Sequence, residues 1–61
     1  MPVVTVKMLQ GRTQEQKRQL AQELTDVVVR VAKTTVDQVD VIIEEYQPGD
    51  WAKAGTLFSD K

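Results

Sequence analysis

The chain has 61 residues, with 8 Lys and Arg against 9 Asp and Glu, and it contains no cysteine and no histidine. This composition allows one small domain, residues 1–61, and excludes disulfides, thiolate zinc sites and catalytic thiols or imidazoles. The net charge of −1 argues against a nucleic-acid partner, and no apolar run reaches the roughly 20 residues of a membrane span. The first residues lack the pattern of a signal peptide, so we expect a cytoplasmic protein.

Residues 2–9 are predicted to form the first β-strand. The segment is rich in β-branched side chains, and no glycine interrupts it before residue 11. In an extended chain Val4, Val6 and Met8 lie on one face. The opposite face carries Val3, Thr5, Lys7 and Leu9.

Residues 14–32 are predicted to form one long helix. Thr13 and Gln16 have the spacing of a capping box, in which each side chain accepts a hydrogen bond from the other's backbone. Apolar residues then recur at helical spacing, namely Leu20, Leu24, Val27, Val28 and Val31. The valines favour a strand by composition, but in a helix they cost only about 2 kcal/mol in total. The cap and the continuous periodicity therefore favour the helix.

Residues 39–45 are predicted to form the second strand, and residues 46–61 a tail. Val39, Val41 and Ile43 share one face of this strand, and the other face carries Asp40, Ile42 and Glu44. The tail begins with a turn signal at Pro48-Gly49-Asp50, and its remainder is compatible with a short hairpin or a loop.

Strand, helix and strand make a β-α-β unit, so we expect an α+β fold with parallel strands and a right-handed crossover. One helix covers one face of the sheet, which leaves Val3, Leu9 and Ile42 on an uncovered face. Two strands alone are rarely stable, and a chain this short buries only about 60% of its unfolded surface. We therefore expect self-association to supply the missing core.

Few side chains of this sequence are suited to catalysis. Glu44 and Glu45 point to opposite faces of a strand and cannot converge on one site within one chain. Tyr46 and Ser59 have no local partner that would activate them.

Pro2 is the exception, because removal of Met1 would make it an N-terminal secondary amine. Such an amine, neutral near physiological pH, can act as a general base or form an imine. The alternative is that Pro2 merely starts a strand. Removal of Met1 is expected because the side chain at position 2 is small, whereas a retained Met1 would acylate the nitrogen and abolish this chemistry.

Arg12 and Trp51 are candidate substrate-binding residues. Arg12 follows the strand that Pro2 begins, where it can bind an anionic group and keep the amine neutral. The alternative is a surface arginine at the start of a helix, where the helix dipole mildly disfavours a cation. Trp51, the only tryptophan, lies next to a turn and can wall a site or fill an interface.

Several of these features occur together in one known family. Pro2 opens a strand, residues 11–13 read Gly-Arg-Thr, residues 15–17 read Glu-Gln-Lys, residues 39–44 form a second strand, and Trp51 is aromatic. With this spacing the whole chain resembles the 4-oxalocrotonate tautomerase family, the small members of the tautomerase superfamily.

The resemblance implies a β-α-β protomer with a short C-terminal hairpin, dimers with a four-stranded sheet, and a hexamer of three dimers. It also implies an isomerase that needs no cofactor or metal, in which Pro2 moves a proton in a small 2-hydroxy unsaturated carboxylic acid between enol and keto or dienol and enone forms. By the same likeness Arg12 would bind the carboxylate or polarise the carbonyl, and Trp51 would form an apolar wall. A backbone N–H near Leu9 would help to position the substrate.

Asp40 is a departure from the family pattern, because well-studied members carry a second arginine at this position. An acid there repels a dianion and favours the protonated form of a nearby amine. We therefore expect a monocarboxylate, bound by Arg12 alone, as the substrate. If the alignment of the second strand is shifted, Lys7 is an alternative second cation. The sequence leaves open whether Asp40 faces the site.

Two other functions remain open. One keeps Pro2 but uses it in hydration, dehalogenation or decarboxylation of a small unsaturated acid, with Asp40 activating water. The other is a non-catalytic subunit of a heteromeric tautomerase, whose related partner chain supplies the missing arginine.

Overall fold

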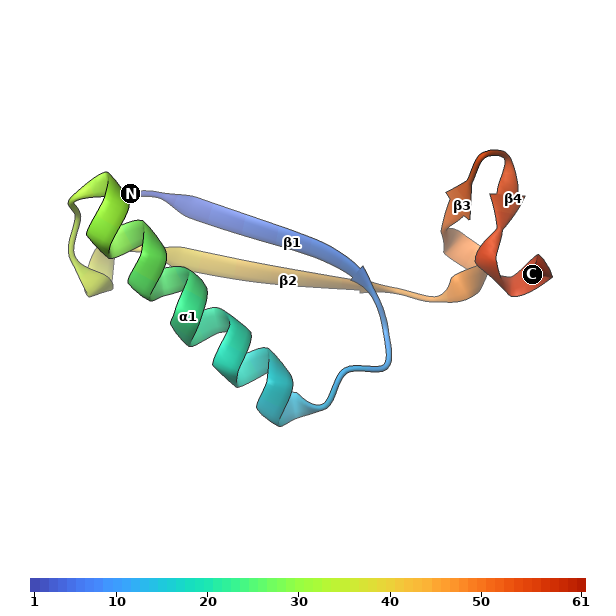
Figure 1. Ribbon diagram of the computed structural model, residues 1–61, viewed down its shortest axis with the longest axis horizontal. Helices are drawn as coiled ribbons and strands as arrows, with labels where there is room; N and C mark the ends of the chain where they lie inside the picture. The colour runs from blue at the N-terminus through green and yellow to red at the C-terminus, as the bar shows by residue number, and fades with distance from the viewer.

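Two parallel strands and one helix make up the larger part of the computed structural model, which describes all of residues 1–61 (Figure 1). In chain order the elements are β1 (Val3–Leu9), α1 (Gln14–Ala32), β2 (Asp40–Tyr46), β3 (Ala52–Lys53) and β4 (Thr56–Leu57). Single 3₁₀ turns occur at Val36–Gln38, Pro48–Asp50 and Phe58–Asp60. Strands β3 and β4 form a small antiparallel hairpin. The α+β class, the parallel strands and the C-terminal hairpin are therefore confirmed.

Strand β2 begins at Asp40 and ends at Tyr46, one residue later at each end than residues 39–45. The cause lies in the preceding turn, where the backbone N–H of Val39 donates to the carbonyl oxygen of Val36 at 3.3 Å. Val39 therefore closes that turn instead of pairing in the sheet. This shift sets which residues of β2 lie beside the start of β1.

The pairing of β1 with β2 runs from Val3 opposite Asp40 to Leu9 opposite Tyr46. It continues for one hydrogen bond beyond the strand at each end. The N–H of Asp40 donates to the carbonyl of Pro2 at 3.0 Å, and the N–H of Gln10 donates to the carbonyl of Tyr46 at 2.9 Å. The sheet is thus held along its whole length.

Helix α1 is capped at both ends. Thr13 and Gln16 form the capping box, with the Gln16 N–H donating to Thr13 Oγ1 at 3.1 Å and the Thr13 N–H donating to Gln16 Oε1 at 2.9 Å. At the other end Lys33 adopts a left-handed conformation and its N–H donates to the carbonyl of Val29. These caps satisfy backbone groups that a helix leaves without partners.

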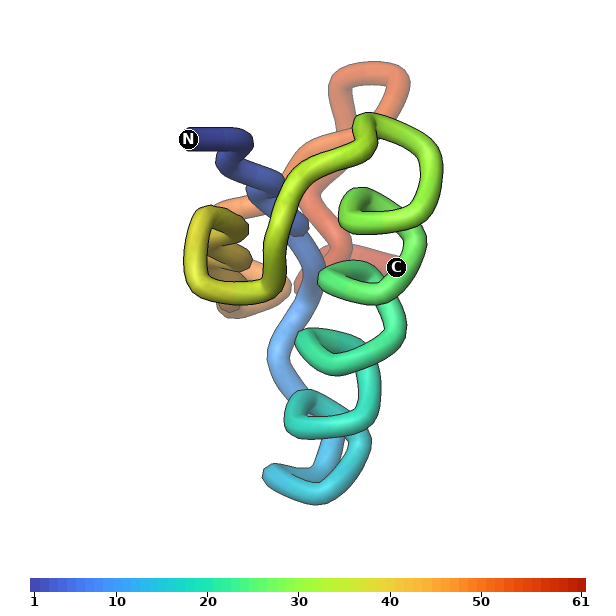
Figure 2. The backbone as a smooth tube through the Cα atoms, turned by 90° about the vertical axis from the view of Figure 1, so that its left-hand side faces the viewer, coloured from blue at the N-terminus to red at the C-terminus, as the bar shows by residue number.

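The helix covers only one face of the sheet (Figure 2). Val4, Val6 and Met8 on that face are half-buried. Lys17 of α1 also pairs with Glu45 of β2, with 2.8 Å between Nζ and Oε1. On the other face Val3 is 57% exposed and Ile42 is 47% exposed.

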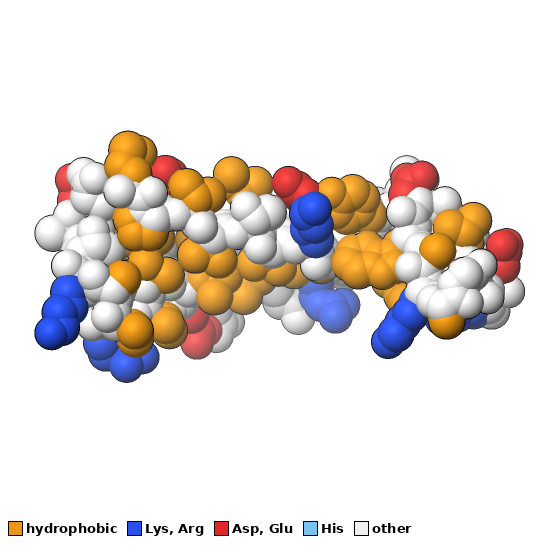
Figure 3. Space-filling view, turned by 90° about the horizontal axis from the view of Figure 1, so that it is seen from above, with side chains coloured by type: hydrophobic (Ala, Val, Ile, Leu, Met, Phe, Trp, Pro, Cys, Tyr) orange, Lys and Arg blue, Asp and Glu red, His pale blue; other side chains and the backbone are white.

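No residue of the isolated chain is fully buried. The radius of gyration is 14.5 Å, whereas a compact chain of this length has about 10.5 Å. The excess arises because the hairpin projects from the end of the sheet (Figure 1). Hydrophobic side chains gather along the middle of the molecule and again at the hairpin (Figure 3). The apolar surface is therefore incompletely covered within one chain, and no helix has the length and apolarity to cross a membrane.

Candidate functional site

Pro2 and Asp40 are neighbours at one end of the sheet. Pro2 is half-buried just before β1, and its carbonyl oxygen accepts the hydrogen bond from the N–H of Asp40. Asp40 pairs with Val3, and paired residues of adjacent strands direct their side chains to the same face. The side chain of Asp40 thus lies on the face of the sheet that α1 leaves uncovered. It is beside Val3, the residue that follows Pro2.

The other candidate residues lie around a hollow of about 650 Å³ at the opposite end of β1. It is formed where the end of β1 and the following loop face the C-terminal hairpin. Its lining is Met8, Leu9, Gln10, Arg12, Trp51, Lys53 and Phe58. The structure therefore brings together three residues that the sequence singles out, Leu9, Arg12 and Trp51.

Aromatic contacts fix the position of Trp51 in this hollow. Its ring lies edge-on to Tyr46, with 5.9 Å between centroids, and stacks on Phe58 at 6.4 Å. The backbone carbonyl of Trp51 also accepts a hydrogen bond from the Phe58 N–H at 2.9 Å. Such aromatic pairs favour a defined arrangement, so Trp51 and Phe58 form a firm apolar wall.

Tyr46 is further held by its hydroxyl, which donates to Glu44 Oε2 at 2.6 Å. This hydrogen bond is the main reason why the pKa of Tyr46 is raised above its ordinary value, and desolvation and the negative charge of Glu44 act in the same direction. Tyr46 therefore keeps its proton in the neutral pH range, and we assign it no acid–base role.

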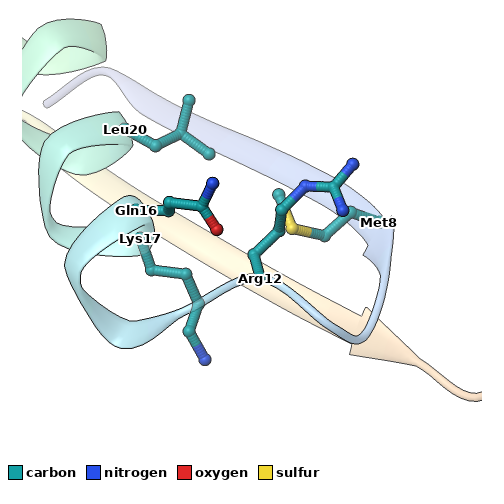
Figure 4. A pocket seen from close by; sticks show the side chains of 5 residues that line it. All are labelled: Met8, Arg12, Gln16, Lys17 and Leu20. Atoms are coloured by element: carbon teal, nitrogen blue, oxygen red, sulfur yellow. The ribbon is translucent and has the colours of Figure 1, made fainter.

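Arg12 also borders a smaller hollow of about 200 Å³ between β1 and α1 (Figure 4). Met8, Gln16, Lys17 and Leu20 complete its lining. Lys17 is neutralised by Glu45 and Gln16 is engaged in the capping box, whereas Arg12 takes part in no ion pair. Arg12 is thus a cation available to an anionic ligand.

One chain does not bring Pro2 and Arg12 together. They lie beyond opposite ends of β1, and a seven-residue strand spans about 23 Å (Figure 1). Within one chain, Arg12 therefore cannot hold a group that Pro2 acts on.

Lys7 also lies outside the larger hollow. It stands opposite Glu44 in the sheet and borders a separate groove with Tyr46, Asp50, Trp51 and Ala52. The residues of the larger hollow that sequence reasoning missed are Met8, Gln10, Lys53 and Phe58. Gly55 is the available signal for Lys53, because a tight turn that contains this glycine places Lys53 at the end of a strand.

Comparison with known proteins gives one consistent result. The family described as "Tautomerase enzyme" matches residues 2–61. The 2-hydroxymuconate tautomerase of Bacillus subtilis (strain 168) is 45% identical over 60 residues, which cover 98% of this chain and 97% of that protein.

Solved structures agree with the sequence comparison. The crystal structure of a 4-oxalocrotonate tautomerase homologue matches with a TM-score of 0.95 and 41% identity, covering 100% of this chain and 97% of that one. A heterohexamer 4-oxalocrotonate tautomerase from Chloroflexus aurantiacus J-10-fl matches with a TM-score of 0.92 and 30% identity, covering 98% and 97% of the two chains.

Proposed function

The chain belongs to the tautomerase family and is an isomerase, and on this premise we propose that Pro2, as the N-terminal residue of the mature protein, is its general base. The substrate is a small 2-hydroxy unsaturated monocarboxylic acid. The reaction moves a proton between oxygen and carbon and requires no cofactor.

The observation that carries the proposal is the placement of Pro2 and the larger hollow at opposite ends of β1. A second copy paired antiparallel along β1, around a two-fold axis near Val6, puts each Pro2 beside the other copy's residue 10. Pro2 then faces the hollow that contains Arg12 and Trp51. The same pairing makes a four-stranded sheet from two chains.

The uncovered sheet face supports assembly beyond this pair. Val3 and Ile42 remain exposed in a four-stranded sheet, and their burial between dimers would contribute about 25 cal/mol for each Å² removed from water. The hexamer of three dimers is our proposed form of the protein. The heterohexamer from Chloroflexus aurantiacus is a relative with six subunits.

In the shared site each residue has a separate role. The amine of Pro2, whose neutral form is favoured by apolar surroundings and the Arg12 cation, takes the enol proton and returns it to carbon. Arg12 binds the carboxylate and draws electron density toward the developing carbonyl. Trp51 excludes water, and a backbone N–H near Leu9 orients the substrate.

Asp40 is the basis for preferring a monocarboxylate. Its carboxylate lies one residue along from Pro2, so it would repel a second negative charge brought to that end of the site. A dicarboxylate with one charge at each end is therefore a poor fit.

Replacement of Pro2 tests the proposal. Pro2→Ala keeps a terminal amine but makes it primary and more mobile, so we expect enol–keto conversion to fall by at least about 100-fold, the usual contribution of a positioned base. Intact mass should show that Met1 is absent, and light scattering should show the same assembly in both proteins. Unchanged activity in Pro2→Ala would falsify the base role.

The proximity of Asp40 to Pro2 also favours a second candidate, in which Asp40 activates water for hydration, dehalogenation or decarboxylation of an unsaturated acid. A protonated Pro2 would then act as the acid, so activity would fall as pH rises instead of increasing. A rising pH–rate profile excludes this candidate.

Asp40 in place of the family's arginine also leaves room for a non-catalytic subunit of a heteromer. Purified chain would then be inactive on small enol acids and would gain activity only when mixed with a related chain. Activity of the pure protein excludes this alternative.

A further inference from the structure

Lys53 is a second cation in the hollow that contains Arg12. Arg12 comes from the loop after β1 and Lys53 from the end of β3, so two segments far apart in the sequence line the same space. The remaining lining side chains are apolar apart from Gln10, and no acid is among them. The chain as a whole has a net charge of −1, so two cations in this hollow without an acid are a local excess of positive charge.

Neither cation is neutralised within the chain. The ion pairs of the structure are Lys17–Glu45 and Arg18–Glu15, and neither involves Arg12 or Lys53. Lys61 adds a further positive charge nearby, because its Nζ lies 4.3 Å from the centroid of the Phe58 ring. The hollow therefore presents two cations that no ion pair within the chain neutralises.

The hairpin holds Lys53 in place. Lys53 pairs with Thr56 across β3 and β4, and the two residues between them, Ala54 and Gly55, both have positive φ angles of 54° and 85°. This is the conformation of a tight type I′ hairpin turn, which matches the twist of the flanking strands. A lysine on such a turn loses less freedom when it binds than one on a mobile loop.

We propose that Lys53, together with Arg12, binds the carboxylate of the substrate, so that the site has a cationic end in the hollow and an acidic end at Asp40. This deepens the proposed function and rests on it for the reaction. One carboxylate would then lie between the two cations, with the uncharged part of the molecule directed toward Pro2 of the other copy. Lys53 is then a substrate-binding residue that determines specificity for monoanions.

Binding without turnover tests Lys53 independently of Pro2. Trp51 is the only tryptophan and lines the hollow, so its fluorescence reports occupancy. Hexanoate is the probe, and uncharged hexanamide is its control. We expect Lys53→Met to weaken hexanoate binding about tenfold, the effect of losing one hydrogen bond to a charged group, and to leave hexanamide binding unchanged. Lys53→Arg should retain the affinity.

Lys33→Met is the matched control, because Lys33 is an exposed lysine at the far end of α1 and makes no ion pair. Equal hexanoate affinity in Lys53→Met and the wild type, or an equal loss in Lys33→Met, overturns the proposal. With a monocarboxylate substrate, Lys53→Met should raise KM and leave kcat nearly unchanged. If Lys53→Met weakens hexanoate binding while Pro2→Ala remains active, the base role of Pro2 is refuted. The role of Lys53 in anion binding would then still hold.

Discussion

Asp40 lies directly beside Pro2, because its backbone N–H donates a hydrogen bond to the Pro2 carbonyl oxygen at 3.0 Å. A carboxylate close to an amine favours the protonated amine, which cannot act as a base. In Asp40→Asn we therefore expect the pKa of the Pro2 amine to fall, and the rise of kcat/KM with pH to move about half a unit toward acid.

The pH dependence of kcat/KM measures this shift, with Asp26→Asn on the exposed surface of α1 as the control. A profile that stays in place, or moves toward alkali, would show that the carboxylate of Asp40 does not act on the amine.

The exposed sheet face should control assembly. Ile42 is 47% exposed and lies on the face that α1 leaves uncovered, so Ile42→Lys would place a charge in the proposed interface between dimers. We expect light scattering to find dimers or monomers in place of the proposed hexamer. Val36→Lys, at a more exposed position in a connecting turn, is the control that should leave the assembly intact. A hexameric Ile42→Lys protein would contradict burial of this face.

The capping box should contribute measurably to stability. Thr13→Ala removes the side-chain acceptor of the Gln16 N–H, and loss of such a cap costs about 1 kcal/mol. Denaturant unfolding at fixed protein concentration measures the difference, since assembly also stabilises the fold. Thr13→Ser retains the acceptor and should recover most of the loss. Equal stability of the alanine variant and the wild type would refute this contribution.

Tyr46 should ionise at higher pH than an ordinary tyrosine. Its pKa is raised chiefly by the hydrogen bond that its hydroxyl donates to Glu44. Because this pKa is higher in the folded state, the hydrogen bond contributes its full stabilisation below about pH 10, the pKa of tyrosine in the unfolded chain. The stabilisation is lost as pH rises through the pKa of Tyr46 in the folded protein.

Because Tyr46 is the only tyrosine, ultraviolet absorbance follows its titration directly. Glu44→Gln should lower the pKa of Tyr46 toward the ordinary value. Any stability advantage of the wild type over Glu44→Gln should be lost in strong alkali, where the ionised Tyr46 is repelled by the Glu44 carboxylate. Glu23→Gln on α1 is the control. An unchanged titration in Glu44→Gln would show that this hydrogen bond does not set the pKa.

Local signals in the sequence account for most of the fold. Thr13, Gln16 and the spacing of the apolar residues define α1, because caps and helical periodicity act within a few residues of each other. The shift of β2 by one residue could not be predicted, because it depends on whether the Val39 N–H bonds to the turn or to the sheet. Which partner the Val39 N–H takes depends on the register in which β2 pairs with β1.

The candidate site residues could be named individually from the sequence, but their arrangement could not. Pro2, Arg12 and Trp51 stand out by chemical type, yet their distribution over two ends of the sheet follows from the length and pairing of β1. Lys53 was missed because Gly55 signals a turn but does not fix its type, which also depends on Ala54 at positive φ, a conformation that alanine rarely adopts.

The distance between Pro2 and Arg12 along β1 has a genetic consequence. If each site takes Pro2 from one chain and Arg12 from another, two defective chains can complement each other. A mixed dimer of Pro2→Ala and Arg12→Ala chains has one site with both defects and one with neither. Co-expression of two inactive alleles should therefore restore activity, and random pairing of equal amounts should yield about a quarter of the wild-type sites. Enzyme activity in the cell would thus require both alleles to be expressed together, because neither allele alone encodes an active protein.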